Sequence, residues 1–188
     1  MSMNDLREEI RILIADKAYQ KRTVRLASGR MSNFYVDCKQ VILTAEGINK
    51  IALYILGLIQ QENLKISAVG GPAMGAVPLA SAVSALSFQP PFSSPLDTFF
   101  VRSEAKAHGM QNKVDGPTLR EGMSLLLLDD VLTTGGSVLK AADAVREMGC
   151  RVEKVLVIVD RQEGGRENLE KESLSVSSIL TRDELEGS

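Results

Sequence analysis

The sequence predicts an α/β fold with a mostly parallel central sheet flanked by helices. Apolar segments of strand length alternate along the chain with segments whose apolar residues recur at helical spacing. The four consecutive leucines at residues 125–128 fit a strand that is buried on both faces, as in parallel sheets. Because parallel strands need a crossover connection, a helix between successive strands is the expected link. These observations together predict a doubly wound sheet.

The amino-terminal half is expected to begin with an amphipathic helix, because Leu6, Ile10, Leu13 and Ile14 recur at helical spacing. Thr44 precedes a longer helical pattern, and its side chain suits an N-cap. After the first helix we expect short strands within residues 23–40, a helix over 45–60, a strand over 66–69 and a small-residue helix over 73–86.

The carboxyl-terminal half continues the alternation around one long irregular segment. Residues 103–119 are polar and show no periodicity, and a connection of that length is often an active-site lid. Thr181 and Glu184 have the spacing of a capping box, which marks the start of a helix. The other expected elements are strands over 98–101, 124–128, 154–159 and near 174–179, and helices over 138–148 and after Gly165.

Length and composition limit the classes of function. The chain has 188 residues, of which 44% are apolar and 24% charged, and this suits one soluble domain with a sizeable core. A net charge of −2 disfavours a dedicated nucleic-acid binder. The sequence has no apolar run of the ~20 residues that a membrane span needs, and no secretory signal pattern. Cys38 and Cys150 lack metal-ligand spacing and fit a reducing compartment. We therefore expect a cytoplasmic protein that binds neither nucleic acid nor membrane.

The strongest chemical signal follows the leucine run. Asp129 and Asp130 come first, and a Thr-Thr-Gly-Gly-Ser turn at residues 133–137 leads into the next helix. The turn offers hydroxyls, glycines that can take positive φ and free N–H groups at a helix start, all of which favour a phosphate. The carboxylates suit sugar hydroxyls or a hydrated Mg²⁺, although strand geometry would make the two side chains diverge. An ordinary turn with a Ser or Thr N-cap would explain the acids alone but not the whole block.

A second signal is the group of cations in the expected lid. Arg102, Lys106 and His108 lie within a few residues of one another. A lone histidine or lysine on a loop is usually just solvated. A cluster of cations on a mobile loop, however, suits closure over a multiply charged leaving group, with exclusion of water.

Two further segments carry side chains that can contact a second bound molecule. Arg161 follows an apolar strand, and arginine is the natural bidentate partner for a carboxylate, although a surface ion pair is the simpler interpretation. Phe34 and Tyr35 can stack on a flat ring, or they can belong to the core of a strand.

These segments resemble those of one protein family. The block at 129–137 resembles the signature with which type I phosphoribosyltransferases bind 5-phosphoribosyl 1-diphosphate (PRPP). The pattern Arg-x-Glu-x-Lys-x-His-Gly at 102–109 is similar to the catalytic loop of orotate phosphoribosyltransferases, which reaches into the site of the neighbouring subunit. Residues 26–37 are similar to the segment that covers the base in the same family.

The resemblance implies a fold and a reaction. The fold is a type I phosphoribosyltransferase core forming a single domain over residues 1–188, with a small hood segment in 1–43 and a flexible catalytic loop at 103–119. The reaction converts orotate and PRPP to orotidine 5′-monophosphate and pyrophosphate in pyrimidine (UMP) biosynthesis. It also implies a homodimer with a shared lid, and Mg²⁺ that PRPP carries in without direct protein side-chain ligands.

The resemblance also implies roles for individual residues. Lys106, His108, Asp129 and Asp130 are the expected catalytic residues. Orotate is expected to contact Thr133, Arg161, Phe34 and Tyr35. The expected PRPP-binding residues are Arg102, Ser103, Lys106, His108, Asp129, Asp130, Val131, Leu132, Thr133, Thr134, Gly135, Gly136 and Ser137.

Two other functions fit the donor half of this pattern. One is transfer to another base, such as a purine, because the signature at 129–137 is shared across the superfamily. The other is a non-enzymatic PRPP-sensing regulator, for which we would expect an added DNA-binding domain or a basic face. The chain also has Ala27, Gly75 and Ser103 where some family members carry lysine. We expect Ser103 to leave the lid with one cation fewer for pyrophosphate.

Overall fold

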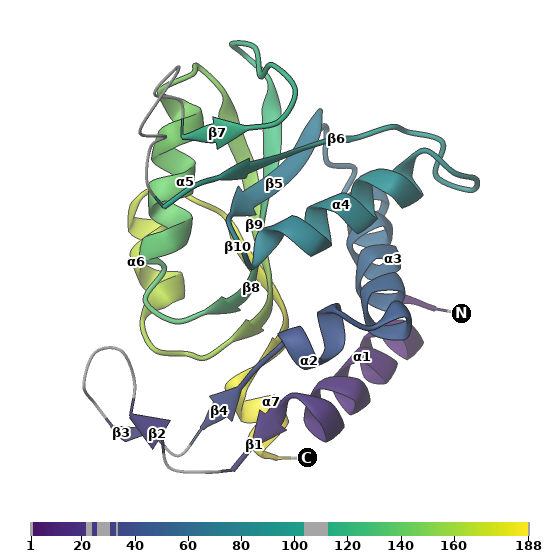
Figure 1. The fold of residues 1–188 in the computed structure, drawn as a ribbon, viewed down its shortest axis with the longest axis vertical. Helices are drawn as coiled ribbons and strands as arrows, with labels where there is room; N and C mark the ends of the chain where they lie inside the picture. Colours follow the sequence, from purple (N-terminus) through teal and green to yellow (C-terminus); the bar gives the residue numbers. More distant parts are fainter. Residues whose placement is uncertain (1, 22–23, 26–30, 33, 104–112, 188) are drawn as a thin grey trace.

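The predicted sheet is present and mostly parallel. The computed structural model describes residues 2–21, 24–25, 31–32, 34–103 and 113–187. In the part that it describes, the largest sheet has the order β10-β9-β8-β5-β6-β7, and only its edge strand β7 is antiparallel (Figure 1). This architecture confirms the predicted fold class. The strands are β5 (Ala68–Pro72), β6 (Asp97–Val101), β7 (Val114–Asp115), β8 (Ser124–Leu132), β9 (Arg151–Asp160) and β10 (Val176–Thr181).

Helices cover both faces of this sheet. Leu126 and Leu128 of β8 belong to a hydrophobic cluster with the helices of one face, and Leu125 and Leu127 belong to a second cluster on the other face. This alternation explains why the strand reads as an unbroken run of leucines. The first face carries α1 (Met3–Lys17), α3 (Ala45–Gln61) and α4 (Ala76–Ser87), and the second carries α5 (Gly136–Arg146) and α6 (Gly165–Lys171).

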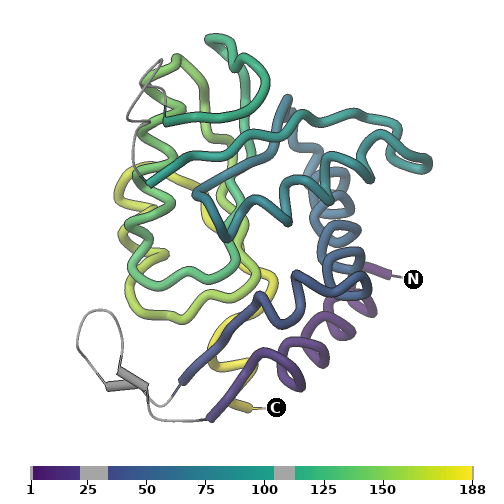
Figure 2. The backbone as a smooth tube through the Cα atoms, in the orientation of Figure 1, coloured from purple at the N-terminus to yellow at the C-terminus, as the bar shows by residue number. Residues whose placement is uncertain are grey.

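Small elements lie beyond the carboxyl end of β8. Figure 2 shows the chain passing from α1 through this region before it enters α3. As predicted, residues 23–40 contain short strands, but they also contain the start of a one-turn helix, α2. Four residues are too few to show helical periodicity, and burial of Val41 and Ile42 fixes this turn instead. The elements are β1 (Tyr19–Gln20), β2 (Val24–Arg25), β3 (Met31–Ser32), β4 (Tyr35–Val36), α2 (Lys39–Ile42) and, from the other end of the chain, α7 (Arg182–Glu186).

Two predicted helix starts are confirmed in detail. The Thr44 hydroxyl accepts the N–H of Gly47 at the start of α3. Thr181 and Glu184 form the expected capping box at α7.

The boundaries near the site differ from prediction. The strand predicted over 124–128 continues to Leu132, because Asp129 and Val131 pair in register with Val157 and Val159 of β9. The acids therefore lie inside a strand rather than after it. The strand predicted over 66–69 instead includes Gly70 and Pro72, the helix predicted from residue 73 begins at Ala76, and the last strand runs to Thr181.

The long irregular segment at 103–119 is partly a strand. Val114 and Asp115 pair with Val101 and Phe100, so the described end of this segment forms the base of a hairpin. The Arg102 N–H donates to the Lys113 carbonyl at 2.8 Å, and the Arg102 side chain forms an ion pair with Asp115. Two residues of strand are too short to give an alternating pattern in the sequence.

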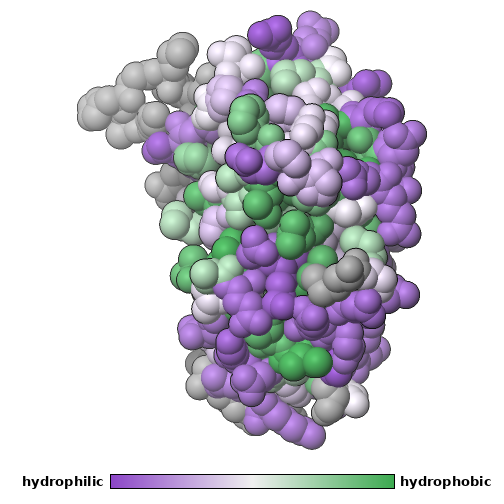
Figure 3. Space-filling view, turned by 90° about the vertical axis from the view of Figure 1, so that its right-hand side faces the viewer, coloured by the Kyte–Doolittle hydropathy of each residue, from purple (hydrophilic) through white to green (hydrophobic). Residues whose placement is uncertain are grey.

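The surface shows no apolar belt on the face drawn in Figure 3, where hydrophilic side chains surround several separate hydrophobic areas. Within the described residues, no helix has the length and apolar character needed to cross a membrane. Cys38 and Cys150 are both buried free thiols.

Candidate active site

The predicted acid pair lies where the carboxyl end of β8 meets the start of α4. All four carboxylate oxygens have partners. Oδ1 of Asp129 accepts the Asp130 N–H, and Oδ1 of Asp130 accepts the Val131 N–H, each at 2.9 Å. Oδ2 of Asp129 accepts the Ser137 hydroxyl at 3.2 Å, and Oδ2 of Asp130 lies 3.4 Å from Nζ of Lys39. The pair is therefore held in one arrangement by its own strand and by two other elements.

The two carboxylates converge, contrary to the divergence expected from strand geometry. A Cβ placed on Gly75 would lie 2.4 Å from Oδ1 of Asp129 and 2.7 Å from Oδ1 of Asp130. Each Oδ1 atom accepts a hydrogen bond from the main-chain N–H of the next residue, Asp130 or Val131. These local hydrogen bonds orient the two carboxylates toward the same side, although strand side chains otherwise alternate between faces. Gly75 thus lets the start of α4 approach the Oδ1 atoms of both acids, which a side chain at this position would prevent.

Burial makes Asp129 a weak acid. It is 6% exposed, and burial together with the neighbouring charge of Asp130 raises the pKa of Asp129 to about 7. Hydrogen bonds from the Asp130 N–H and from Ser137 oppose this rise in pKa. Asp129 therefore gains or loses its proton near neutral pH.

The turn at 133–137, which the sequence predicts to bind phosphate, lies between β8 and α5. Gly135 has φ of +82° and is the N-cap of α5, so a glycine suits this position. The N–H groups at the start of a helix of this length favour an anion.

The turn at 133–137 contacts α6, and no local sequence pattern predicts this contact. Asn168 donates its amide to the Thr134 carbonyl at 3.1 Å. A Cβ on Gly165 would lie 2.3 Å from the Thr133 carbonyl oxygen, so α6 begins in direct contact with the loop. No local signal marks these residues, because they act through a contact between two elements.

Arg161 lies at the carboxyl end of β9, beside β8, and is 8% exposed. Its guanidinium lies 2.8 Å from Oε1 of Glu163 and donates to the Phe34 carbonyl at 3.2 Å. The structure places the Phe34 ring in the core, which is the alternative that the sequence left open for it. The ring is 0% exposed and packs against Tyr19, with Arg161 and Arg182 over its face, so it has no surface to offer a base. Thr133 and Tyr35 are partly exposed.

The described end of the lid, Arg102 and Ser103, lines a hollow of about 200 Å³. Ser137, whose hydroxyl donates to Asp129, also lines this hollow, so the hollow adjoins the acid pair. Lys140, one turn further along α5, adds a cation that the sequence analysis did not select. Lys106 and His108, the lid residues expected to be catalytic, lie outside the described residues, as does Ala27.

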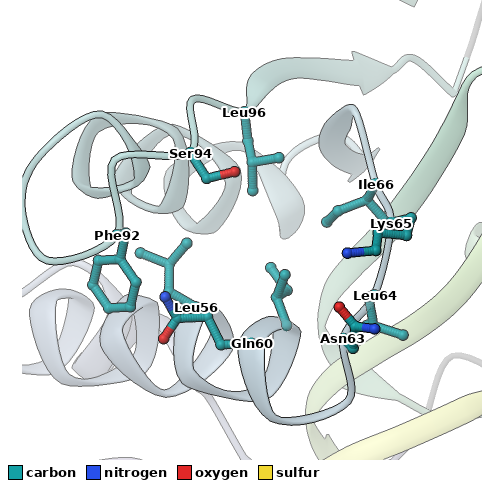
Figure 4. A pocket seen from close by; sticks show the side chains of 10 residues that line it. Leu56, Gln60, Asn63, Leu64, Lys65, Ile66, Phe92, Ser94 and Leu96 are labelled. Carbon is teal, nitrogen blue, oxygen red and sulfur yellow. The ribbon is translucent and has the colours of Figure 1, made fainter.

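A second hollow, of about 170 Å³, lies elsewhere (Figure 4). Leu56 and Gln60 of α3, Ile66 and the segment 92–96 surround it. Ile66 precedes β5, whereas the acid pair faces the residues that follow β5. The second hollow is therefore separate from the site around Asp129 and Asp130.

Two acids, a helix start with a glycine N-cap and a buried arginine lie toward the carboxyl ends of the adjacent strands β8 and β9, which is where open α/β sheets bind their ligands. The family model of the phosphoribosyl transferase domain matches residues 42–183. An orotate phosphoribosyltransferase of Sorangium cellulosum is 42% identical over 180 residues, which cover 94% of this chain and 91% of that protein.

Solved structures of similar proteins point to the same family. The orotate phosphoribosyltransferase of Mycobacterium tuberculosis in complex with Fe(III) dicitrate has a TM-score of 0.80 and 34% identity, covering 96% of this chain and 98% of that one. The same enzyme in complex with PRPP has a TM-score of 0.76 and 30% identity, with coverages of 96% and 99%. The chain belongs to the phosphoribosyl transferase family, in its orotate phosphoribosyltransferase branch.

Proposed function

We propose that this protein transfers the phosphoribosyl group of PRPP to orotate in the cytoplasm, yielding orotidine 5′-monophosphate and pyrophosphate for pyrimidine (UMP) biosynthesis. The observation that carries the proposal is the meeting of three groups at adjacent strand ends. These are the converging acids of β8, the phosphate loop that follows them, and Arg161 at the end of β9.

The donor is held by β8 and its loop. Residues 133–137 bind the 5′-phosphate through N–H groups and hydroxyls at the start of α5. Asp129 and Asp130, which are adjacent near the carboxyl end of β8, accept the ribose hydroxyls. As the bond from the anomeric carbon to the diphosphate oxygen breaks, positive charge develops on the sugar, and the two carboxylates stabilise it.

The acceptor is placed by Arg161. Its guanidinium pairs with the orotate carboxylate, while Thr133 and Tyr35 line the base. The Phe34 carbonyl and Glu163 hold the guanidinium in place from the protein side. The deprotonated N1 of orotate forms the new bond to the anomeric carbon, so the reaction requires no protein base.

We propose that Mg²⁺ enters the site bound to PRPP. Among the described residues, no group of three or more His, Cys, Asp or Glu side chains is placed to hold a metal ion. Mg²⁺ bound by PRPP would neutralise diphosphate charge. Arg102, Lys106 and His108 close over the departing pyrophosphate, and we propose that this lid acts across a homodimer.

The test is to follow loss of orotate absorbance after mixing the protein with PRPP and Mg²⁺. We expect turnover, and none when PRPP is omitted. The double variant Asp129→Asn/Asp130→Asn should fold and show no turnover. If the protein consumes a purine base but not orotate, the acceptor is a purine and the proposed acceptor is wrong. PRPP binding without turnover of any base would favour a regulator.

A further inference from the structure

Lys39 extends from outside the sheet to the acid pair. It is the first residue of α2, and its Nζ lies 3.4 Å from Oδ2 of Asp130 and 4.0 Å from Oδ1 of Asp37. Its side chain is 55% exposed, but its backbone is anchored because Val41 and Ile42, on the same helical turn, are fully buried. The ammonium is therefore carried to Asp130 by a fixed element and not by a mobile loop.

Lys39 has a distinct place among the partners of the acid pair. Main-chain N–H groups and the Ser137 hydroxyl satisfy three of the four carboxylate oxygens. The fourth, Oδ2 of Asp130, faces Lys39, and in the described parts of the chain no other cation forms an ion pair with either acid. The negative charge of Asp130 is also the main cause that raises the pKa of Lys39, so the ammonium is stabilised by this contact.

One short segment links Lys39 to the acceptor side. The Phe34 carbonyl accepts a hydrogen bond from Arg161, and five residues later Lys39 contacts Asp130. Between them, β4 pairs with β1, and the Asp37 N–H donates to the Ala18 carbonyl at 3.0 Å. The segment thus contacts both the arginine assigned to orotate and an acid assigned to the ribose.

We propose that Lys39 is a positioning residue for the transfer: its ammonium holds the Asp130 carboxylate in the orientation that receives the ribose of PRPP. The inference rests on the proposed function. It gives α2 a specific role in binding the donor, while the lid acts on the pyrophosphate.

The experiment compares Lys39→Met with Lys39→Arg, and uses Lys171→Met on α6 as a control for the loss of one exposed lysine. Lys39→Met should weaken PRPP binding, measured by calorimetry, and raise the KM for PRPP by about tenfold, as expected for one lost charge-assisted contact. The KM for orotate should stay within about twofold, because Arg161 is unchanged. Lys39→Arg should retain most of the PRPP affinity, and Lys171→Met all of it.

A pH profile separates positioning from simple support of the fold. The charged and titratable groups around Asp130 are Asp129 on its own strand, and Asp37, Cys38 and Lys39 at α2. Without the ammonium, the charge of Asp130 is no longer offset, so Asp129, whose pKa is already raised, should ionise only at a higher pH. The acidic limb of kcat/KM for PRPP should therefore move to higher pH in Lys39→Met and stay in place in Lys171→Met.

The outcomes are distinct. An unchanged PRPP affinity and pH profile in Lys39→Met would overturn the proposal. So would an equal loss in Lys39→Arg accompanied by a lower Tm, because that pattern indicates a structural role. If the unmodified protein binds PRPP but turns over no base, the proposed function fails. Weaker binding of PRPP by Lys39→Met would then still support a role for Lys39 in holding the ribose.

Discussion

At the scale of single residues, Asp129 connects the chemistry of the site to the stability of the fold. Its pKa is raised to about 7 by burial and by the charge of Asp130. The unfolded chain loses this proton near pH 4 and the folded protein near pH 7, so the folded state binds more protons between these values. The contribution of Asp129 to stability is therefore complete at low pH and is lost as the pH rises through about 7.

We accordingly predict that Asp129→Asn removes a pH-dependent loss of unfolding free energy. Relative to this variant, the parent protein should lose about 2–3 kcal/mol of unfolding free energy between about pH 5 and pH 8. Urea unfolding of both proteins at the two pH values measures the difference, in which the other titrating groups largely cancel. A difference that is constant with pH would contradict the raised pKa.

Arg161 is the residue on which we propose that acceptor specificity depends. We predict that Arg161→Ala raises the KM for orotate by about 10- to 100-fold, since a charge-assisted pair is lost, while the KM for PRPP changes little. Truncation also leaves the poorly exposed Glu163 without its ion pair. The double variant Arg161→Ala/Glu163→Gln controls for this. An orotate KM that recovers in the double variant would show that Glu163 and not the lost cation caused the effect.

At the scale of elements, the phosphate loop depends on the start of α6. Adjacent glycines allow a matched comparison. A Cβ on Gly165 would lie 2.3 Å from the Thr133 carbonyl oxygen, whereas a Cβ on Gly164 would meet no atom within 4 Å. Gly164 has φ of +88°, so alanine there costs only about 1 kcal/mol of backbone strain.

We predict that Gly165→Ala displaces the loop and raises the KM for PRPP by at least about tenfold, because the obstructing atom is backbone and cannot rotate away. Gly164→Ala should lower Tm slightly and leave the KM for PRPP near its original value. Steady-state kinetics and thermal unfolding of the two variants provide the comparison. Equal effects on KM would argue against support of the loop by α6.

At the scale of the whole molecule, the proposal requires a lid that acts across a dimer. A mixture of Lys106→Ala with Asp129→Asn/Asp130→Asn tests this, because each mixed dimer would contain one site with both an intact lid and intact acids. Random pairing makes half of the dimers mixed, so about a quarter of the parent activity is expected. Each variant alone should remain at least about 100-fold less active. No recovery after subunit exchange would place the lid in its own subunit.

The sequence by itself determined the parallel sheet, because leucines 125–128 leave no polar face. It also located the acids, the turn at 133–137 and Arg161, because polar and glycine-containing segments follow apolar runs directly. The tertiary structure decided what depends on contacts between distant segments. Pairing with β9 extends β8 through the acids, and packing against Tyr19 buries Phe34. Lys39 reaches an acid 91 residues away only because α2 folds over the end of β8. Local patterns record periodicity and turn chemistry, whereas such contacts arise when burial and strand pairing bring separate elements together.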